Sequence, residues 1–415
     1  MTYRMNHFLA LGVILLASAC GGSGGGAPPP IVVDGAGIER IDSAMNGVMN
    51  RHAPPGIAVA VVRNGKLAVA KSYGSADLDG MEPLRPDHLF RIASISKPVT
   101  GMAAIRAIEE GLLDPDAAVF DILQSYLPQS GADPRLPLMT VKHLMHHTGG
   151  WNIVDYPNDP LFRSREIAEA VGSTMPPDPN ALTRWVAMQP LDFDPGSSFA
   201  YTNIGYVVLG RVLEQSTGFA YEDFVRRFVL EPAGVTKAQL GGITRAKRRP
   251  DEVEYESFQN SIWTSVFDGD SVVPEPAYGG INLVGLDASS AWLFSVVDLV
   301  RLAAAVDGDA GYPEIISTQS FEFMTAIGTP AGTTPLGVAW FLGTNGTGDV
   351  VKWDHGGGMP GTTAYLARLP DGVIIAAISN TALEQDFFGD LAVGLTDAVE
   401  GIVDWPDTDL FPQFP

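Results

Sequence analysis

The spacing of apolar positions differs between parts of this chain, and it predicts where helices and strands lie. Residues 38–51 repeat apolar residues at helical spacing, which predicts a helix with one buried face. The apolar positions on that face are Ile38, Ile41, Met45 and Val48. Two short apolar runs, 57–63 and 66–71, meet at Asn64-Gly65, a dipeptide that favours the tight turn of a β-hairpin.

The middle of the chain has a mainly helical pattern, and strands return towards its end. Helices are predicted at 204–216 and 221–230, and Ser295 with Asp298 forms the cap that opens another. The predicted strands of the last part are 337–343, 350–353, 362–369 and 372–379, followed by a helix at 386–402.

This distribution predicts an α+β fold. Strands from both chain ends would pair into one antiparallel sheet, which is flanked by the terminal helices, and the central segment would form a mainly helical lobe. The folded domain is expected over residues 37–415. Its sheet lobe would comprise 37–95 and 290–415, and its helical lobe about 96–289.

Residues 1–36 have a different composition and predict export. Residues 1–19 combine Arg4 with a short apolar run, which is typical of a signal peptide and too short to span a bilayer. Small residues directly before Cys20 resemble a bacterial lipoprotein signal, in which Cys20 is lipidated. The alternative is an ordinary signal peptide that leaves a free thiol. Residues 20–36 would be a Gly/Pro-rich tether. We expect a periplasmic lipoprotein of the bacterial cell envelope, held to the membrane by its lipid anchor.

Composition narrows the possible partners. The chain has 415 residues, 46% of them hydrophobic, so it can bury a large core. Its net charge of −22 repels phosphate backbones, and nucleic-acid binding is not expected. The single cysteine excludes a disulfide within the chain. The sequence leaves the oligomeric state open.

The first candidate for chemistry is the pair Ser94 and Lys97. Three residues apart on a helix, their side chains share one face. A desolvated lysine can take the proton of a serine hydroxyl and make it a nucleophile. Pro98 belongs in a first helical turn, so the positive end of the helix dipole should lie near Ser94. Taken alone, the same spacing also fits a helix-capping serine with a surface lysine.

Two further motifs lie in the second half of the chain. Tyr201 with Asn203 precedes a predicted helix, and a tyrosine acts as a base only when its pKa falls well below about 10. His355 with the glycines 356–358 lies at the start of a predicted strand, where glycines let a substrate approach backbone N–H groups. Each motif alone also fits ordinary packing or a turn.

Taken together and in this order, Ser-x-x-Lys, Tyr-x-Asn and His-Gly-Gly resemble the serine beta-lactamase and penicillin-binding-protein superfamily. The Tyr-x-Asn form is similar to its class C-like branch, which includes family VIII carboxylesterases. The stretches that carry the resemblance are Leu89–Ser94, His143–Gly150 and Pro195–Asn203.

The resemblance implies a beta-lactamase-like fold and a role for each matching residue. Ser94 would be acylated, and Tyr201 would be the base whose pKa Lys97 lowers. Asn203 would position Lys97 and the substrate. An oxyanion hole would form from backbone N–H groups of Ser94 and Gly358. The remaining third-motif residues, His355, Gly356 and Gly357, would line the substrate site.

The third motif departs from true beta-lactamases, which carry Lys-Thr/Ser-Gly there to hold the carboxylate of the antibiotic. His355 offers a weaker, pH-dependent charge and Gly357 offers no hydroxyl. We therefore expect a serine hydrolase that cleaves carboxylic esters. The alternatives are a D-amino-acid peptidase or amidase, a weak class C-type beta-lactamase and a non-catalytic binding protein.

No cofactor is expected. His143, His146 and His147 are close in sequence and raise the question of a metal site, but the Glu of His-Glu-x-x-His is missing and no third ligand is obvious. We therefore predict no metal.

Overall fold

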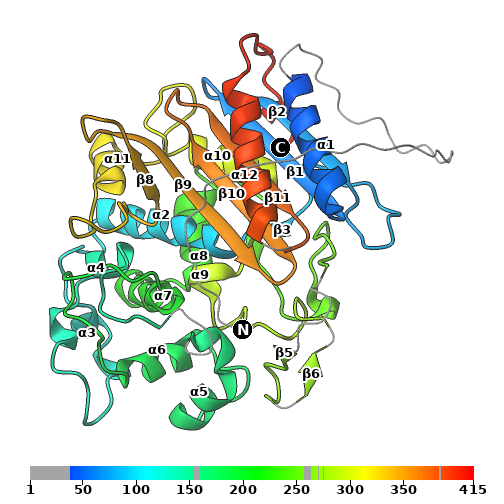
Figure 1. Cartoon of the computed structure of the whole chain (residues 1–415). Coiled ribbons are helices and arrows are strands. Elements are labelled where there is room, and N and C mark those ends of the chain that lie inside the picture. Colours follow the sequence, from blue (N-terminus) through cyan, green and yellow to red (C-terminus); the bar gives the residue numbers. More distant parts are fainter. Residues whose placement is uncertain (1–37, 154–158, 257–262, 270, 274, 383–384) are drawn as a thin grey trace. The chain divides into compact units, whose positions relative to one another are not determined.

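The computed structural model describes the chain from residue 38 onward, apart from three short internal segments and two single residues (Figure 1). The described ranges are 38–153, 159–256, 263–269, 271–273, 275–382 and 385–415. The predicted signal peptide, Cys20 and the tether lie outside the described residues. Within these ranges no helix combines the length and the hydropathy needed to cross a membrane.

One six-stranded antiparallel sheet organises the fold, and both chain ends contribute to it. Its strand order is β2-β1-β11-β10-β9-β8, and Ile57 of β1 lies opposite Ser379 of β11. This confirms the predicted sheet. The strands are β1 (Gly56–Arg63), β2 (Lys66–Gly74), β8 (Phe341–Thr344), β9 (Val350–Met359), β10 (Thr362–Arg368) and β11 (Ile374–Ser379).

The hairpin at the start of the chain has the predicted turn. Asn64 and Gly65, between β1 and β2, have φ values of 51° and 71°. A two-residue type I′ turn requires positive φ at both positions, which asparagine and glycine tolerate best. The Asn-Gly signal therefore located this turn correctly.

Two helices from opposite chain ends cover one face of the sheet, α1 (Ile38–His52) and α12 (Gln385–Glu400) (Figure 1). Ile41 and Met45 of α1 are fully buried in one apolar cluster with Leu391 of α12. Burial of such a side chain contributes about 1.5–3 kcal/mol. All four apolar positions predicted for this helix are buried.

Helices α2 (Ser96–Glu109) and α10 (Val296–Ala304) lie on the other side, where α10 packs against β1 and β11. The hydroxyl oxygen of Ser295 accepts a hydrogen bond from the N–H of Asp298 at 3.0 Å, which confirms the predicted cap of α10. The first turns of α2 are buried on all sides, so this helix can hold a functional group rigidly.

The middle of the chain is mainly helical, as predicted. Its longest helix is α7 (Asn203–Thr217), and the predicted helix at 221–230 is α8 followed by a π-helical turn, η5. The helices are α3 (Val119–Ile122), α4 (Val141–Met145), α5 (Ser164–Val171), α6 (Pro179–Ala187), α8 (Tyr221–Val225), α9 (Asp287–Ser290) and, later in the chain, α11 (Thr318–Thr325).

Short elements connect these parts. A small sheet has the order β3-β7-β4, and β5 pairs with β6. These strands are β3 (Phe90–Arg91), β4 (Gln239–Leu240), β5 (Trp263–Thr264), β6 (Val272–Val273) and β7 (Trp292–Phe294). The short helical turns are η1 (Ala93–Ile95), η2 (Gln124–Tyr126), η3 (Leu136–Leu138), η4 (Pro160–Phe162), η5 (Arg226–Leu230), η6 (Arg245–Lys247) and η7 (Phe411–Gln413).

Two strand predictions at the end of the chain were wrong in their bounds. The strand predicted from 337 begins only at Phe341, because Ala339 has a φ of 63° and the backbone is not extended there. The strand predicted to end at 353 continues to Met359, so His355 and its glycines form the end of β9 instead of the start of a strand. Glycines carry no alternation of side chains, which hid this continuation.

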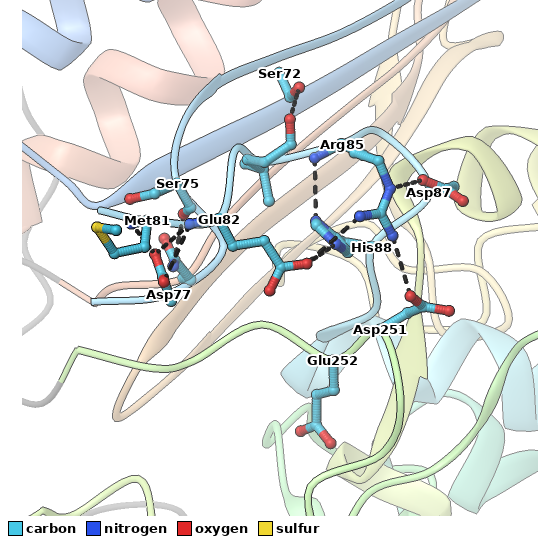
Figure 2. A network of polar contacts seen from close by, with 12 residues as sticks. Ser72, Ser75, Asp77, Met81, Glu82, Arg85, Asp87, His88, Asp251 and Glu252 are labelled. Atoms are coloured by element: carbon cyan, nitrogen blue, oxygen red, sulfur yellow. Dashed lines mark hydrogen bonds and ion pairs between the residues drawn. The ribbon is translucent and has the colours of Figure 1, made fainter. Parts of the chain in front are cut away.

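A polar network fixes the loop that leads from β2 towards β3 (Figure 2). Arg85 contacts Asp87 at 3.1 Å and Asp251 at 3.0 Å, and these side chains converge in the close-up. His88 is buried and contacts Glu82 at 3.1 Å. Exposed ion pairs are each worth only about 0–1 kcal/mol, so the network serves mainly to join distant segments.

Candidate active site

Ser94 lies in a sharp turn between a short strand and a buried helix. The strand β3 ends at Arg91, and α2 begins at Ser96. Between them Ala93 has a φ of 47°, a conformation that non-glycine residues seldom adopt. Ala93 is buried, whereas the side chain of Ser94 is partly exposed. Pro98 lies in the first turn of α2, as predicted, so Ser94 is at the positive end of the helix dipole.

The strand before Ser94 is anchored through Arg91, whose side chain is 1% exposed. Its guanidinium lies 4.4 Å from the ring centre of Tyr255 and donates to the carbonyl oxygen of Gly242 at 3.0 Å. The backbone N–H of Arg91 donates to the Tyr255 hydroxyl at 2.9 Å. The hydroxyl of Thr362 donates to the carbonyl oxygen of Arg91 at 2.7 Å. Contacts from distant segments therefore set the position of this turn.

Lys97 is fully buried, and three oxygen atoms surround its amine. The amine nitrogen lies 3.1 Å from the hydroxyl oxygen of Ser94, 2.8 Å from Oδ1 of Asn203 and 3.2 Å from the carbonyl oxygen of Ser289. Asn203 and Ser289 offer acceptors only at these atoms, whereas a serine hydroxyl can also donate. A neutral amine that donates to the oxygens of Asn203 and Ser289 would have its lone pair available for the proton of Ser94.

Tyr201 and Asn203 reach this cluster from the start of α7. The amine of Lys97 lies 4.8 Å from the ring centre of Tyr201, and the side chain of Ser94 is near enough to act on the pKa of Tyr201. The ring of His147 packs 4.5 Å from the ring of Tyr201, centre to centre. The structure therefore brings together Ser94, Lys97, Tyr201 and Asn203, which the sequence separates by more than 100 residues.

The third motif lies beside the same turn, at the end of β9. A side-chain carbon at Gly357 would lie 2.3 Å from the carbonyl oxygen of Ile92, so only glycine lets β9 pass this closely. The pairing of β8 with β9 ends at Asp354. Among the described residues, one edge of β9 therefore has no strand partner from His355 onward. This part of β9 lies next to the turn that contains Ser94.

The arrangement of these motifs matches one protein family. The family model described as Beta-lactamase matches residues 41–398, which is most of the chain. The chain belongs to the beta-lactamase family.

Individual members of the beta-lactamase family are similar over most of their length. Esterase EstB of Burkholderia gladioli is 27% identical over 87% of this chain and 94% of its own. Penicillin-binding protein 4* of Bacillus subtilis is 24% identical over 75% of this chain, but over only 65% of its own length. The crystal structure of D-amino acid amidase from Ochrobactrum anthropi SV3 superposes with a TM-score of 0.66 at 20% identity, covering 88% of this chain and 97% of that one. The fold and the family together make this chain a serine hydrolase.

The third motif of this beta-lactamase-family chain carries no charge at neutral pH. His355 is 2% exposed, and burial lowers its pKa to about 3 with a further contribution from the charge of Lys97. Nδ1 of His355 lies 2.6 Å from the carbonyl oxygen of Gly356, so this nitrogen carries the proton. The pH-dependent charge expected from the sequence is therefore absent here, because the imidazole is desolvated.

The pKa values of Lys97 and Tyr201 differ from those expected from the sequence. Burial lowers the pKa of Lys97 to about 7, although the charge of Asp159 raises it. Burial raises the pKa of Tyr201 well above its usual value, with Ser94 opposing this and Asp159 adding to it. The predicted lowering of the tyrosine pKa by Lys97 is thus wrong for the free protein. Tyr201 holds its proton, and Lys97 is the group that is readily neutral.

Asp159 is a site residue that sequence reasoning missed. It precedes η4, is 3% exposed, and its Oδ2 accepts a hydrogen bond from Nδ2 of Asn203 at 2.8 Å. A single aspartate in a segment for which the sequence predicts no helix or strand gave no signal. A buried acceptor for the NH₂ group of Asn203 was nevertheless to be expected, because buried amides are normally hydrogen-bonded.

The histidines 143 and 147 each accept a hydrogen bond from a backbone N–H group. Nδ1 of His143 accepts from the N–H of Thr140 at 3.1 Å, and Nδ1 of His147 accepts from the N–H of Thr202 at 3.2 Å. In the part of the chain that the structure describes, no three His, Cys, Asp or Glu side chains are grouped so that they could hold a metal ion.

Proposed function

We propose that this protein hydrolyses carboxylic esters through an acyl-enzyme formed on Ser94. The observation that carries the proposal is the position of the Lys97 amine, 3.1 Å from the hydroxyl of Ser94 and fixed by two further acceptors. A general base must lie within hydrogen-bond reach of the proton that it takes and have a pKa near the working pH. Lys97 satisfies both conditions, with a pKa of about 7.

Acylation then proceeds with Lys97 as the first proton acceptor. The hydroxyl oxygen of Ser94 attacks the ester carbonyl while its proton passes to the neutral amine of Lys97. Tyr201, which still holds its proton, donates it to the leaving alkoxide as the carbon–oxygen bond of the ester breaks. The Lys97 ammonium returns a proton to Tyr201, so the free alcohol leaves and an acyl-serine remains. This order reverses the roles that the sequence resemblance implied for the two residues.

Deacylation uses the same groups in the opposite direction. A water molecule attacks the acyl carbonyl and gives a proton to Tyr201, while Tyr201 passes its own proton to the neutral amine of Lys97. The bond to the oxygen of Ser94 breaks, the Lys97 ammonium returns a proton to Ser94, and the carboxylic acid leaves. In both steps the oxyanion would be held by backbone N–H groups of Ser94 and Gly358, the latter in the part of β9 that lies beyond its pairing with β8.

The neutral third motif supports an ester over a lactam antibiotic. A buried, uncharged His355 cannot attract a substrate carboxylate as an ammonium would, and Gly357 brings no hydroxyl. The likeness to an esterase, 27% identical along nearly the whole chain, points the same way. A D-amino-acid amide is the second candidate, because the proton retained on Tyr201 suits an amine leaving group.

One panel of substrates tests the proposal on a single preparation. It contains 4-nitrophenyl acetate and butyrate, a chromogenic cephalosporin and D-phenylalanine amide, with wild type and Ser94→Ala compared on each. We expect ester hydrolysis in the wild type and its loss in Ser94→Ala. Ester hydrolysis that persists in Ser94→Ala contradicts the proposal, and turnover of the amide alone would favour the second candidate.

We also propose that the chain is exported and tethered to the cell envelope through a lipid on Cys20. The signal-like residues 1–19, the cysteine that follows them and the tether 20–36 support this. Expression of the full chain in a bacterium, followed by fractionation, should place the wild type in the membrane fraction and Cys20→Ser in the soluble envelope fraction. A wild-type chain found in the cytoplasm would contradict the proposal.

A further inference from the structure

A buried chain of hydrogen bonds extends behind the proposed base. Oδ2 of Asp159 accepts from Nδ2 of Asn203 at 2.8 Å, and Oδ1 of Asn203 accepts from the amine of Lys97 at 2.8 Å. A carboxylate only accepts, so the Asp159 end fixes which way the Asn203 amide points, whether or not Lys97 is protonated. A flipped amide would place its oxygen against the carboxylate of Asp159 and lose that bond.

Asp159 is also the charged neighbour of Lys97. The other titratable groups facing it come from separate elements, namely Tyr201 before α7, His147 after α4 and His355 in β9. Burial raises the pKa of Tyr201 and lowers the pKa of both histidines, so all three are neutral near pH 7. Burial lowers the pKa of Lys97, and the charge of Asp159 raises it. Asp159 is itself only 3% exposed. Its charge is therefore poorly screened by solvent.

We infer that Asp159 is a positioning residue, which orients the Asn203 amide and through it sets where the Lys97 amine lies and how readily it takes the proton of Ser94. This inference rests on the proposed acyl-enzyme chemistry of Ser94. Asp159 acts through its bond to Asn203 and through its charge on Lys97. Its two effects, orientation and charge, are separable by substitution.

Asp159→Asn keeps the size of the side chain and an oxygen that can accept from Asn203, and it removes the charge. Without that charge the ammonium form of Lys97 is less stable, so the pKa of Lys97 falls. Because Lys97 must be neutral to act, the reaction should persist to lower pH. The rate at pH 5.5, expressed as a fraction of each protein's maximal rate, should be about threefold or more higher in Asp159→Asn than in wild type.

Asp159→Ala removes the acceptor as well, so the Asn203 amide loses its fixed orientation. Misplacement of a catalytic group by about 1 Å can cost roughly 100-fold in rate. We expect a loss of this order in kcat, with KM little changed. The matched control is Asp298→Asn, another buried aspartate, which contacts Arg301 at 3.2 Å in α10 and should leave both the rate and its pH profile unchanged.

The experiment measures how fast a fluorophosphonate labels Ser94 between pH 5 and 9, by intact-protein mass, together with hydrolysis of 4-nitrophenyl acetate. Labelling needs no knowledge of the natural substrate. A thermal melt of each variant verifies folding, and if Asp159→Ala fails to fold, the pH profile of Asp159→Asn decides alone.

The expected result is a shift of the acidic limb to lower pH in Asp159→Asn and a lower rate in Asp159→Ala. The inference is overturned if Ser94 is labelled normally and Asp159→Asn has the wild-type profile. If the wild-type protein is not labelled on Ser94 at all, the proposed function fails, and the inference fails with it for that distinct reason.

Discussion

Gly357 and Ile92 lie so close together that a methyl group on the glycine would be 2.3 Å from the carbonyl oxygen of Ile92. This approach joins the end of β9 to the turn that presents Ser94, although more than 250 residues separate the two segments in sequence. The distance between the proposed nucleophile and the proposed oxyanion donor on Gly358 therefore depends on the absence of a side chain at position 357.

Gly357→Ala should separate β9 from the Ser94 turn. We expect kcat/KM for 4-nitrophenyl acetate to fall about 100-fold, since misplaced groups cost rates of that order. Steady-state kinetics measure the loss. The matched control is Gly389→Ala in α12, where an added carbon meets no atom within 4 Å. That variant should keep full activity, and equal activity in both variants would contradict the geometry.

The pH profile of the enzyme should have one acidic limb set by Lys97. Because burial lowers the pKa of Lys97 to about 7 and only the neutral amine accepts a proton, kcat/KM should fall about tenfold per pH unit below that value. Hydrolysis followed from pH 5 to 9 measures this limb. An acidic limb near pH 4–5, where the carboxyl groups titrate, would argue that Lys97 is not the base.

His355→Lys should move substrate preference towards molecules that carry a carboxylate. A cation at this position can attract the carboxylate of a cephalosporin, which the neutral imidazole cannot. We expect the ratio of cephalosporin to ester turnover to rise by about tenfold or more, since each 1.4 kcal/mol of added attraction gives that factor. His355→Asn, which stays neutral, is the control and should keep the wild-type ratio. If the two variants have the same ratio, charge at this position does not determine the preference.

Tyr255→Phe should destabilise the protein, because its hydroxyl accepts from the N–H of Arg91 at 2.9 Å and donates to Glu252 at 3.0 Å. Leaving these buried groups unpaired costs about 1–3 kcal/mol of unfolding free energy. Denaturant unfolding measures it. Tyr312→Phe removes a half-buried hydroxyl that donates to Ala233 at 3.2 Å, and its cost should be the smaller one. A larger loss in Tyr312→Phe would contradict this interpretation.

Local signals in the sequence predicted much of the fold because their physical causes are local. Asn64-Gly65 forms its turn since both residues tolerate positive φ, and Ser295 caps α10 since its hydroxyl reaches the N–H of Asp298. The apolar face of α1 is buried as its spacing requires. Motif order also identified Ser94, Lys97, Tyr201 and Asn203, which the structure places in one cluster.

Features that depend on tertiary surroundings were not predictable in the same way. Asp159 reaches Asn203 only because the fold places it beside the start of α7. The degree of burial decides that Tyr201 keeps its proton and that Lys97 readily loses one, and residue types alone do not reveal burial. The extension of β9 through three glycines follows from pairing with β10, which leaves no trace in hydrophobic alternation.

The most direct test of the account is to trap the acyl-enzyme. The wild-type protein is mixed with a slowly hydrolysed 4-nitrophenyl ester, quenched in acid within seconds, and analysed by intact mass and peptide mapping. We predict that the mass rises by one acyl group on the peptide that contains Ser94, and that Lys97→Met and Ser94→Ala form no such adduct. Ester turnover without an adduct on Ser94, or an unchanged rate of acylation in Lys97→Met, would contradict the central claim.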